Sequence, residues 1–345
     1  LAGGGLYQHY IPSTASSLMQ RSEWITSYTP YQAEAAQGTL VMYYEFQTYM
    51  AMLTGQEVAN GGMYDGSTAL AEAILMARRL RPKARVVHLS EGVHPEYREV
   101  VASYLRYQDV ELRTLPLDPQ TGRTIIDLPR DEQRDALAIA IQSPNFLGVI
   151  EDAAGLDPEA FTIGVCAEAQ SLALLPPLPA AVSVGEAQSL GVPIQLGGPT
   201  AGFFATSKQH VRQLPGRLVG RTVDQQGRDA FCITLATREQ FIRRGKATSN
   251  ICTASGLMCL RVVLYLSRMG RKGLQDVARM SARSARAFAQ GLEEVGLVRP
   301  LSGSYFNEFV IDASARPDLH AKLREQGFLM GLPLERWFPQ MKDRY

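Results

Sequence analysis

The chain has 345 residues, of which 46% are hydrophobic and 20% are charged, a composition typical of a globular protein and not of a disordered or fibrous one. Lys and Arg total 35 and Asp and Glu total 34, which leaves a formal charge of +1 and argues against nucleic acid as the main ligand. No apolar run reaches the roughly 18 residues that a membrane helix needs, so we expect no membrane segment. Four Cys without paired spacing indicate reduced thiols, and no signal peptide is visible, so we expect a cytoplasmic protein.

The first two thirds of the sequence alternate between helical and strand patterns. Helical periodicity covers residues 38–53, with Gly55 placed to end the helix, and returns at residues 69–80 after Asp65-Gly66-Ser67-Thr68. Short apolar segments typical of buried strands follow at residues 85–89, 110–115, 136–142, 161–165, 180–184 and 202–206. Helical segments at residues 95–107 and 209–218 accompany them. This alternation predicts a mixed or parallel α/β sheet.

Beyond residue 238 the pattern changes to long helices at residues 253–269 and 274–295, separated by Gly270 and Gly273. A strand at 306–311, a helix at 318–326 and a strand at 328–332 predict a small second α/β unit that closes no full sheet. We therefore divide the chain into an N-terminal segment with one helix (1–60), a large α/β domain (61–252), and connector helices with an incomplete small C-terminal α/β domain (253–345). Aromatic residues surround most of the helix at 41–50, so this helix lies either at a subunit interface or wholly within the core.

Few segments carry a pattern that indicates chemistry. The five His are scattered without ligand spacing, and neither G-x-S-x-G nor G-x-G-x-x-G occurs, which argues against a metal site, a serine nucleophile and a dinucleotide site. The loop at residues 61–68 leads into a helix N-terminus, where Ser67 and Thr68 could bind a phosphate. Equally, Asp65 or Ser67 could simply cap that helix.

Two further segments are polar and rigid. Residues 27–34 place Tyr28, Thr29, Tyr31 and Glu34 around a proline, and residues 243–250 place Arg243, Thr248, Ser249 and Asn250 just before a long helix. Each segment could be a binding site or a capped turn, with Asn250 or Thr253 capping the helix that follows.

Several motifs of this sequence resemble glycine decarboxylase, the P-protein of the glycine cleavage system. They match its N-terminal half, which in many bacteria is a separate alpha subunit (subunit 1). The motifs are SYTPYQ at residues 27–32, QGTL at 37–40, MYDGSTALAE at 63–72, GGP at 197–199, PGR at 215–217 and RRGKATSNICT at 243–253. The family extends beyond both ends of this sequence, so the chain resembles a core that lacks both ends.

The resemblance implies a type I pyridoxal-phosphate fold like that of aspartate aminotransferase, with a large mixed seven-stranded sheet and a small C-terminal domain. It also implies an alpha2beta2 heterotetramer with a beta subunit. In that family glycine loses CO₂, and its aminomethyl group passes to the lipoyl group of the H-protein.

The resemblance also implies a division of labour between the subunits. No Lys occurs between Lys83 and Lys208, so the Schiff-base anchor is missing from its usual place, and Glu168 stands where an aspartate would pair with the pyridinium nitrogen. Pyridoxal phosphate would therefore be held covalently by the beta subunit and not anchored by this chain. In this chain Tyr28, Thr29, Tyr31 and Glu34 would line the substrate side.

The cofactor phosphate would be reached across the subunit interface by Thr248, Ser249, Asn250 and Arg243, while Ser67 and Thr68 would be a vestigial phosphate loop. Three hypotheses remain open. The chain completes the active site of the beta subunit, or is a silent structural scaffold for it, or is an autonomous pyridoxal-phosphate enzyme that uses Lys208 or Lys246.

Overall fold

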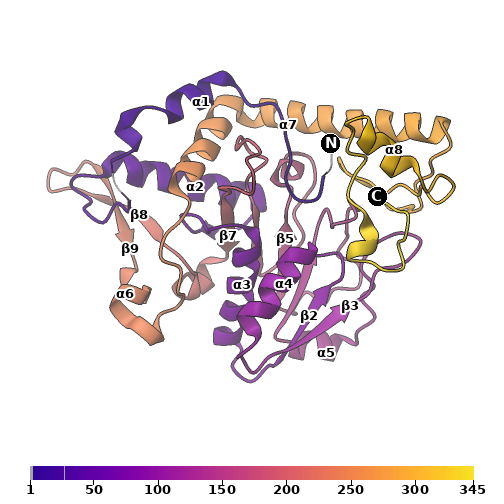
Figure 1. Cartoon of the computed structure of the whole chain (residues 1–345). Helices are drawn as coiled ribbons and strands as arrows, with labels where there is room; N and C mark the ends of the chain where they lie inside the picture. The colour runs from indigo at the N-terminus through magenta and orange to yellow at the C-terminus, as the bar shows by residue number, and fades with distance from the viewer. Residues whose placement is uncertain (1–2, 27) are drawn as a thin grey trace.

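The computed structural model describes residues 3–26 and 28–345, and a seven-stranded sheet forms the centre of the molecule (Figure 1). The strands are β1 (Val58–Ala59), β2 (Val86–Ser90), β3 (Glu111–Leu115), β4 (Ala138–Gln142), β5 (Thr162–Cys166), β6 (Val182–Glu186) and β7 (Gly202–Thr206). Their order is β1-β7-β6-β5-β4-β2-β3, in which β2 to β6 are parallel while β7 runs antiparallel to its neighbours. The predicted mixed sheet is confirmed, and β1 is a short strand that the sequence pattern did not predict.

Both faces of the sheet are covered, which is why its central strands are buried and mostly apolar. Two consecutive residues of β7, whose side chains point to opposite faces, show this. Phe204 packs into one hydrophobic cluster with helix α3 (Gly66–Leu80), and Phe203 packs into another with helix α2 (Gln37–Thr54). Helix α4 (Pro95–Leu105) packs beside α3. These helices confirm the predicted segments, and Gly55 ends α2 with a φ of 68°.

Helix α2 buries seven of its eighteen residues within the chain itself. Tyr43 is buried, and Tyr49 hydroxyl lies 3.0 Å from Ser267 Oγ of helix α7 (Gly256–Glu294). A role of this helix at a subunit interface stays a prediction, as do the domain boundaries drawn from the sequence. Among the described residues, no helix is both long enough and apolar enough to cross a membrane.

A two-stranded hairpin projects from the body of the molecule, at the left of Figure 1. It consists of β8 (Leu218–Val223) and β9 (Asp229–Thr234), joined by a turn in which Asp224 accepts from the Gln226 and Arg228 amides. The prediction of a helical segment at residues 209–218 is wrong in part, because the helical turn η3 (Lys208–Gln213) is short and β8 begins at Leu218. After the hairpin come η4 (Ala236–Arg238), α6 (Gln240–Arg243) and η5 (Arg244–Lys246).

The two predicted C-terminal long helices are confirmed as the halves of α7, which meet at Gly270 with a φ of 59° and a ψ of −178°. Helix α8 (Leu319–Glu325) confirms the predicted helix at 318–326. The predicted strands at 306–311 and 328–332 are wrong, since this part of the chain forms only isolated bridges such as Val298 with Asp312. Phe306 is buried against Ala278 and Ala282 of α7, so its apolar character reflects helix contact and not a strand ladder.

The remaining short elements connect these parts. They are α1 (Ser13–Met19), η1 (Ser22–Trp24), α5 (Arg130–Asp135), η2 (Ala169–Ala173) and η6 (Leu334–Arg336).

Candidate functional site

The carboxyl ends of the parallel strands form one candidate site, because α/β sheets bind ligands at this edge. We call it the carboxyl-edge cleft and define it by Asp65, His94, Gln142, Glu168 and Glu186, which follow or end the central strands or precede α3. All but Asp65 are buried. The His94 backbone N–H donates to Gln142 Oε1 over 2.9 Å, so the ends of β2 and β4 are joined here.

Glu186 occupies the N-terminus of helix α3. Its carboxylate accepts from the backbone N–H groups of Gly66 (3.2 Å), Gln188 (3.0 Å) and Ala201 (2.8 Å). Burial raises the pKa of Glu186 to about 7, and the nearby charge of Asp65 adds to this effect. The Glu186 side chain therefore already uses the Gly66 donor at the positive dipole end of this helix.

The hydroxyl groups of Ser67 and Thr68, the residues predicted to bind phosphate, donate hydrogen bonds to Asp65. Ser67 Oγ donates to Asp65 Oδ1 over 2.5 Å, and Thr68 donates its backbone N–H to the same oxygen and its hydroxyl to the Asp65 carbonyl. This is a capping box, which is the helix-cap interpretation of the loop. A phosphate here would face two carboxylates, so the residues present do not fit it, and the phosphate role of Ser67 and Thr68 stays an untested prediction that this geometry does not favour.

Glu168 is only 2% exposed and is surrounded by donors of its own chain. It accepts from the Gln170 backbone N–H and from Asn307 Nδ2, each over 2.9 Å, and its Oε2 lies 2.9 Å from His9 Nε2. The carboxylate at the position expected to face a pyridinium nitrogen is thus already bonded to three groups of this chain.

The candidate Schiff-base lysines lie away from the cleft. Because β7 is antiparallel to β6, Thr206 pairs with Val182 at the opposite edge of the sheet, and Lys208 follows Thr206 there. Lys208 is exposed, with its Nζ 3.9 Å from Glu57, and Lys246 is exposed in η5. Among the described residues, the cleft therefore lacks the amine that would hold pyridoxal phosphate, and its side chains do not fit that cofactor.

The second candidate site surrounds Arg217, which contacts one predicted polar segment at Tyr31 and the chain two residues beyond the other at Cys252. Arg217 Nη2 donates to Tyr31 hydroxyl over 3.1 Å and to the Cys252 carbonyl, and the guanidinium lies 5.5 Å from the Tyr31 ring centre. Arg217 Nε lies 3.8 Å from Glu239 Oε2, and both side chains are buried. We call Tyr31, Arg217, Glu239 and Cys252 the Arg217 cluster. Arg217 belongs to the PGR motif, and its role follows only from the fold, which places it between these parts of the chain.

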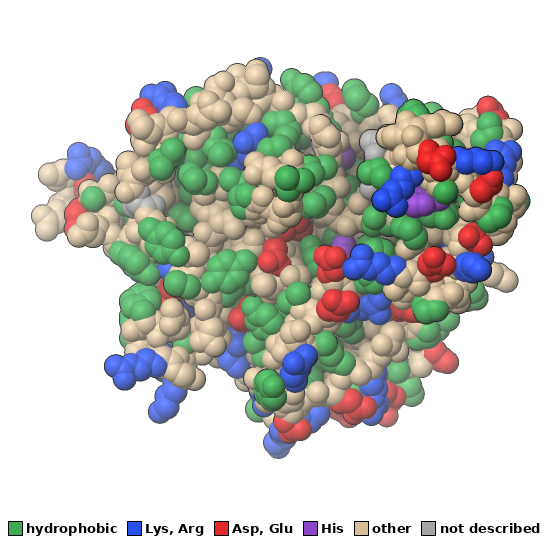
Figure 2. Space-filling view, in the orientation of Figure 1, with side chains coloured by type: hydrophobic (Ala, Val, Ile, Leu, Met, Phe, Trp, Pro, Cys, Tyr) green, Lys and Arg blue, Asp and Glu red, His purple; other side chains and the backbone are tan. Residues whose placement is uncertain are grey.

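The other predicted residues of these two segments differ in exposure. Tyr28 is 76% and Tyr31 56% exposed, and Glu34, Arg243 and Asn250 are exposed. Thr29 is buried, and its hydroxyl has no hydrogen-bond partner within the part of the chain that the structure describes. Ser27 lies outside the described residues. Figure 2 shows hydrophobic and basic side chains gathered around α6 and the hairpin, where Phe241 and Ile242 are exposed.

Thr248 and Ser249 are half-buried and line a small pocket with Leu214, Gly216, Arg238, Glu239 and Ile251. Ser249 Oγ accepts the Ile251 N–H over 3.1 Å and lies beside Glu72, whose pKa is raised by burial and partly lowered by this contact. The alternative in which Asn250 or Thr253 caps the next helix is wrong, because α7 begins at Gly256 with Ser255 as its N-cap residue. The cofactor roles of Thr248, Ser249, Asn250 and Arg243 stay predictions.

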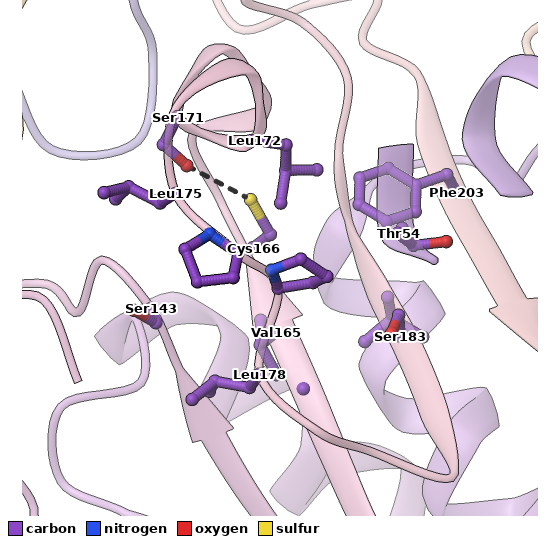
Figure 3. A pocket seen from close by; sticks show the side chains of 14 residues that line it. Thr54, Ser143, Val165, Cys166, Ser171, Leu172, Leu175, Leu178, Ser183 and Phe203 are labelled. Carbon is purple, nitrogen blue, oxygen red and sulfur yellow. Dashed lines mark hydrogen bonds between the residues drawn. The ribbon is translucent and has the colours of Figure 1, made fainter. Parts of the chain in front are cut away.

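A third cavity is mostly apolar and lies beside β5 and β6 (Figure 3). Its lining includes Cys166, whose thiol lies 3.8 Å from Ser171 Oγ and donates to the Glu168 carbonyl over 3.4 Å. Burial raises the pKa of Cys166 to about 12, so its thiol stays protonated and unreactive at neutral pH. The Cys166 thiol therefore does not act as a nucleophile in this cavity at neutral pH.

Because two buried carboxyl groups have raised pKa values, we expect the free energy of unfolding to fall as the pH rises. Desolvation raises the pKa of both Glu186 and Glu308 to about 7, from an ordinary value near 4.5. Between pH 4.5 and 7 the folded chain keeps protons that the unfolded chain has released, so the free energy of unfolding decreases across this window, by at most about 3 kcal/mol for each group. Urea unfolding at pH 5 and pH 8 measures the difference.

Glu308→Gln should remove about half of this difference, since Glu308 faces Tyr7 and Glu168 and its amide analogue does not ionise. Glu335→Gln, at an exposed position of the same part of the chain, is the control and should leave the difference unchanged. Equal pH dependence in the Glu308→Gln variant and the wild type would contradict the assignment.

Comparison with known proteins gives consistent matches over nearly the whole chain. The family model "Glycine cleavage system P-protein" matches residues 1–337. A relative from Anaeromyxobacter dehalogenans (strain 2CP-C) is named probable glycine dehydrogenase (decarboxylating) subunit 1. It is 45% identical over 345 residues, and the match spans 98% of this chain and 77% of the relative. A crystal structure of glycine decarboxylase (P-protein) in inhibitor-bound form superposes with a TM-score of 0.89 at 43% identity, over 97% of this chain and 78% of that one.

A more distant match concerns the fold alone. An aspartate aminotransferase from Thermus thermophilus superposes with a TM-score of 0.61 at 14% identity, over 97% of this chain and 89% of that one. The predicted aspartate-aminotransferase-like fold is confirmed.

Proposed function

This chain belongs to the glycine cleavage system P-protein family, and from this premise we propose that it is the alpha subunit of a heteromeric glycine decarboxylase whose beta subunit carries the cofactor. The complex, an alpha2beta2 heterotetramer of the bacterial cytoplasm, decarboxylates glycine and transfers the aminomethyl group to the lipoyl group of the H-protein. Pyridoxal phosphate is bound covalently to a lysine of the beta subunit.

This proposal rests on the side chains of the carboxyl-edge cleft, which are bonded within this chain and include no anchoring lysine among the described residues. Glu168 and Glu186 are already bonded to donors of this chain, and the lysines considered as anchors lie elsewhere. A member of a decarboxylase family that cannot anchor the cofactor needs a second subunit to supply the amine. This argument disfavours the autonomous enzyme.

The Arg217 cluster is the part of the chain suited to act on a neighbouring active site. Tyr28 and Tyr31 present exposed rings that can exclude water on the substrate side, with Thr29 and Glu34 near them. Arg243, Arg244 and Lys246 are exposed and add positive charge toward an anion such as the phosphate of the partner's cofactor. Thr248, Ser249 and Asn250 supply hydrogen-bond donors beside them.

Reductive trapping tests the proposal. The isolated chain mixed with pyridoxal phosphate and reduced with borohydride should carry no pyridoxyl label at a specific lysine, and it should show no glycine/CO₂ exchange. The reconstituted complex should be active and labelled on the beta subunit alone. Peptide mapping of a stoichiometric label to Lys208 or Lys246 would instead establish the autonomous enzyme.

A second arm of the same experiment distinguishes an active-site contribution from a scaffold. A hydrogen bond to a charged group contributes about 1.5–3 kcal/mol, so complexes with Ser249→Ala should retain the cofactor roughly tenfold less well. Unchanged cofactor affinity and exchange activity in an intact complex would favour the scaffold hypothesis.

A further inference from the structure

The N-terminal residues lie in the carboxyl-edge cleft, where they contact side chains from distant parts of the sequence. The Gly4 N–H donates to Glu308 Oε1 over 2.7 Å, and the Tyr7 hydroxyl donates to Glu308 Oε2 over 2.6 Å. His94 Nε2 donates to the Gly4 carbonyl over 3.0 Å. In Figure 1 this indigo segment lies beside the yellow C-terminal residues.

Gln188 and Glu168 hold the rest of the segment. Gln188 accepts the Tyr7 N–H at its Oε1 over 2.8 Å and donates its Nε2 to the Tyr7 carbonyl over 2.9 Å, so both backbone groups of Tyr7 are satisfied by one amide side chain. His9 bridges Glu168 (2.9 Å) and Ser281 (3.1 Å) through its two ring nitrogens. The segment therefore contacts side chains that follow β2, β5 and β6, the strands whose carboxyl ends form the cleft.

Three consecutive glycines let the backbone enter this narrow space. Gly3, Gly4 and Gly5 have φ values of +68°, +83° and +101°, a region that other residues seldom adopt. A Cβ added at Gly4 would lie 2.3 Å from Leu332 Cδ1, and one added at Gly5 would lie 2.8 Å from His94 Nε2. The glycine run of the sequence thus matches the close approach of the segment to the walls of the cleft.

We infer that residues Gly4–His9 are the resident peptide ligand of the cleft in which this fold binds its cofactor, and that they exclude free pyridoxal phosphate from this subunit. The segment supplies donors to Glu308 and Gln188, whose side-chain oxygens would otherwise be left unsatisfied away from water. Its covalent attachment also gives it a high effective concentration at the cleft. The inference concerns this chain alone and goes beyond the proposed role in the complex.

Hydrogen–deuterium exchange of the full chain tests whether the segment is seated as inferred. The amides of Gly4 and Tyr7 should exchange at least tenfold more slowly than the same amides in a free peptide. Tyr7→Phe removes only the hydroxyl bonded to Glu308, and it should accelerate exchange in the segment about tenfold. Tyr10→Phe is the matched control, because the Tyr10 side chain is 64% exposed, and it should change nothing.

Pyridoxal phosphate is the probe for exclusion. Added to the wild-type chain, it should leave exchange in residues 4–9 unchanged, with the amides of β4 and β5 as the internal reference for an intact fold. Unprotected segment amides in the wild type, equal effects of the two tyrosine variants, or saturable pyridoxal phosphate binding that deprotects the segment would each overturn the inference. None of these outcomes depends on the beta subunit or on turnover, so they leave the proposed function to its own test.

Discussion

Replacing Arg217 with alanine is expected to lower the free energy of unfolding by about 3 kcal/mol, because it leaves the buried Glu239 carboxylate without its partner. The same change removes the bonds to the Tyr31 hydroxyl and the Cys252 carbonyl, which join the two polar segments. Arg217→Lys should recover only part of the loss, since an ammonium lacks the planar fork that reaches several acceptors at once. Urea unfolding of the isolated wild-type chain, Arg217→Ala and Arg217→Lys measures the free energy of unfolding of each.

Arg221→Ala is the matched control, because Arg221 lies four residues further along the chain, in β8, and pairs with Asp229 in an exposed ion pair. Such surface pairs contribute about 1 kcal/mol or less. If Arg217→Ala and Arg221→Ala destabilise the chain equally, the Arg217 cluster does not hold the two segments together. In the reconstituted complex, Arg217→Ala should also reduce exchange activity, since the segment that carries Tyr31 loses its attachment.

Gly185→Ala should destabilise the chain by about 3 kcal/mol or more, which is at the upper end of the usual cost of overpacking. A Cβ at this position would lie 1.9 Å from the Cys166 carbonyl oxygen and 2.7 Å from Phe203 Cζ, so paired backbone would have to move. Gly185 and Cys166 are register partners at the carboxyl ends of β6 and β5.

Gly220→Ala provides the comparison within another strand, where the nearest atom to the new Cβ is Thr234 Cγ2 at an ordinary 3.5 Å. Alanine should be neutral or slightly stabilising there, since it restricts the unfolded chain without a clash. Thermal unfolding should therefore separate the two glycine variants clearly, and similar melting temperatures would contradict the close approach of β5 and β6.

The central strands and the helices α2 to α4 could be predicted because local patterns specify them. Segments such as Ala138–Gln142 are buried on both faces and hence mostly apolar, while Gly55 and Asp65 mark a helix end and a helix start. The hairpin β8–β9 was missed because its strands are mostly half-buried or exposed and alternate weakly. The residues at 306–311 were assigned to a strand because an apolar run looks the same whether it faces a helix or a sheet.

The candidate sites were less predictable, since they depend on contacts between distant residues. The polar segments around Tyr31 and Ser249 were recognised from their composition, but Arg217 acquires its role only when the fold places it between them. Likewise, nothing in the sequence around Gly3-Gly4-Gly5 indicates that this segment contacts His94 and Glu308.

The contact between Gly4 and Glu308 also constrains the order of events during synthesis, because the two residues are separated by 304 positions. At about 5–20 residues per second, the ribosome adds Glu308 roughly 15 to 60 seconds after Gly4. During that time the sheet can assemble while Gly4 remains without this partner. The segment around Gly4 can therefore reach its final place only after Glu308 has been made.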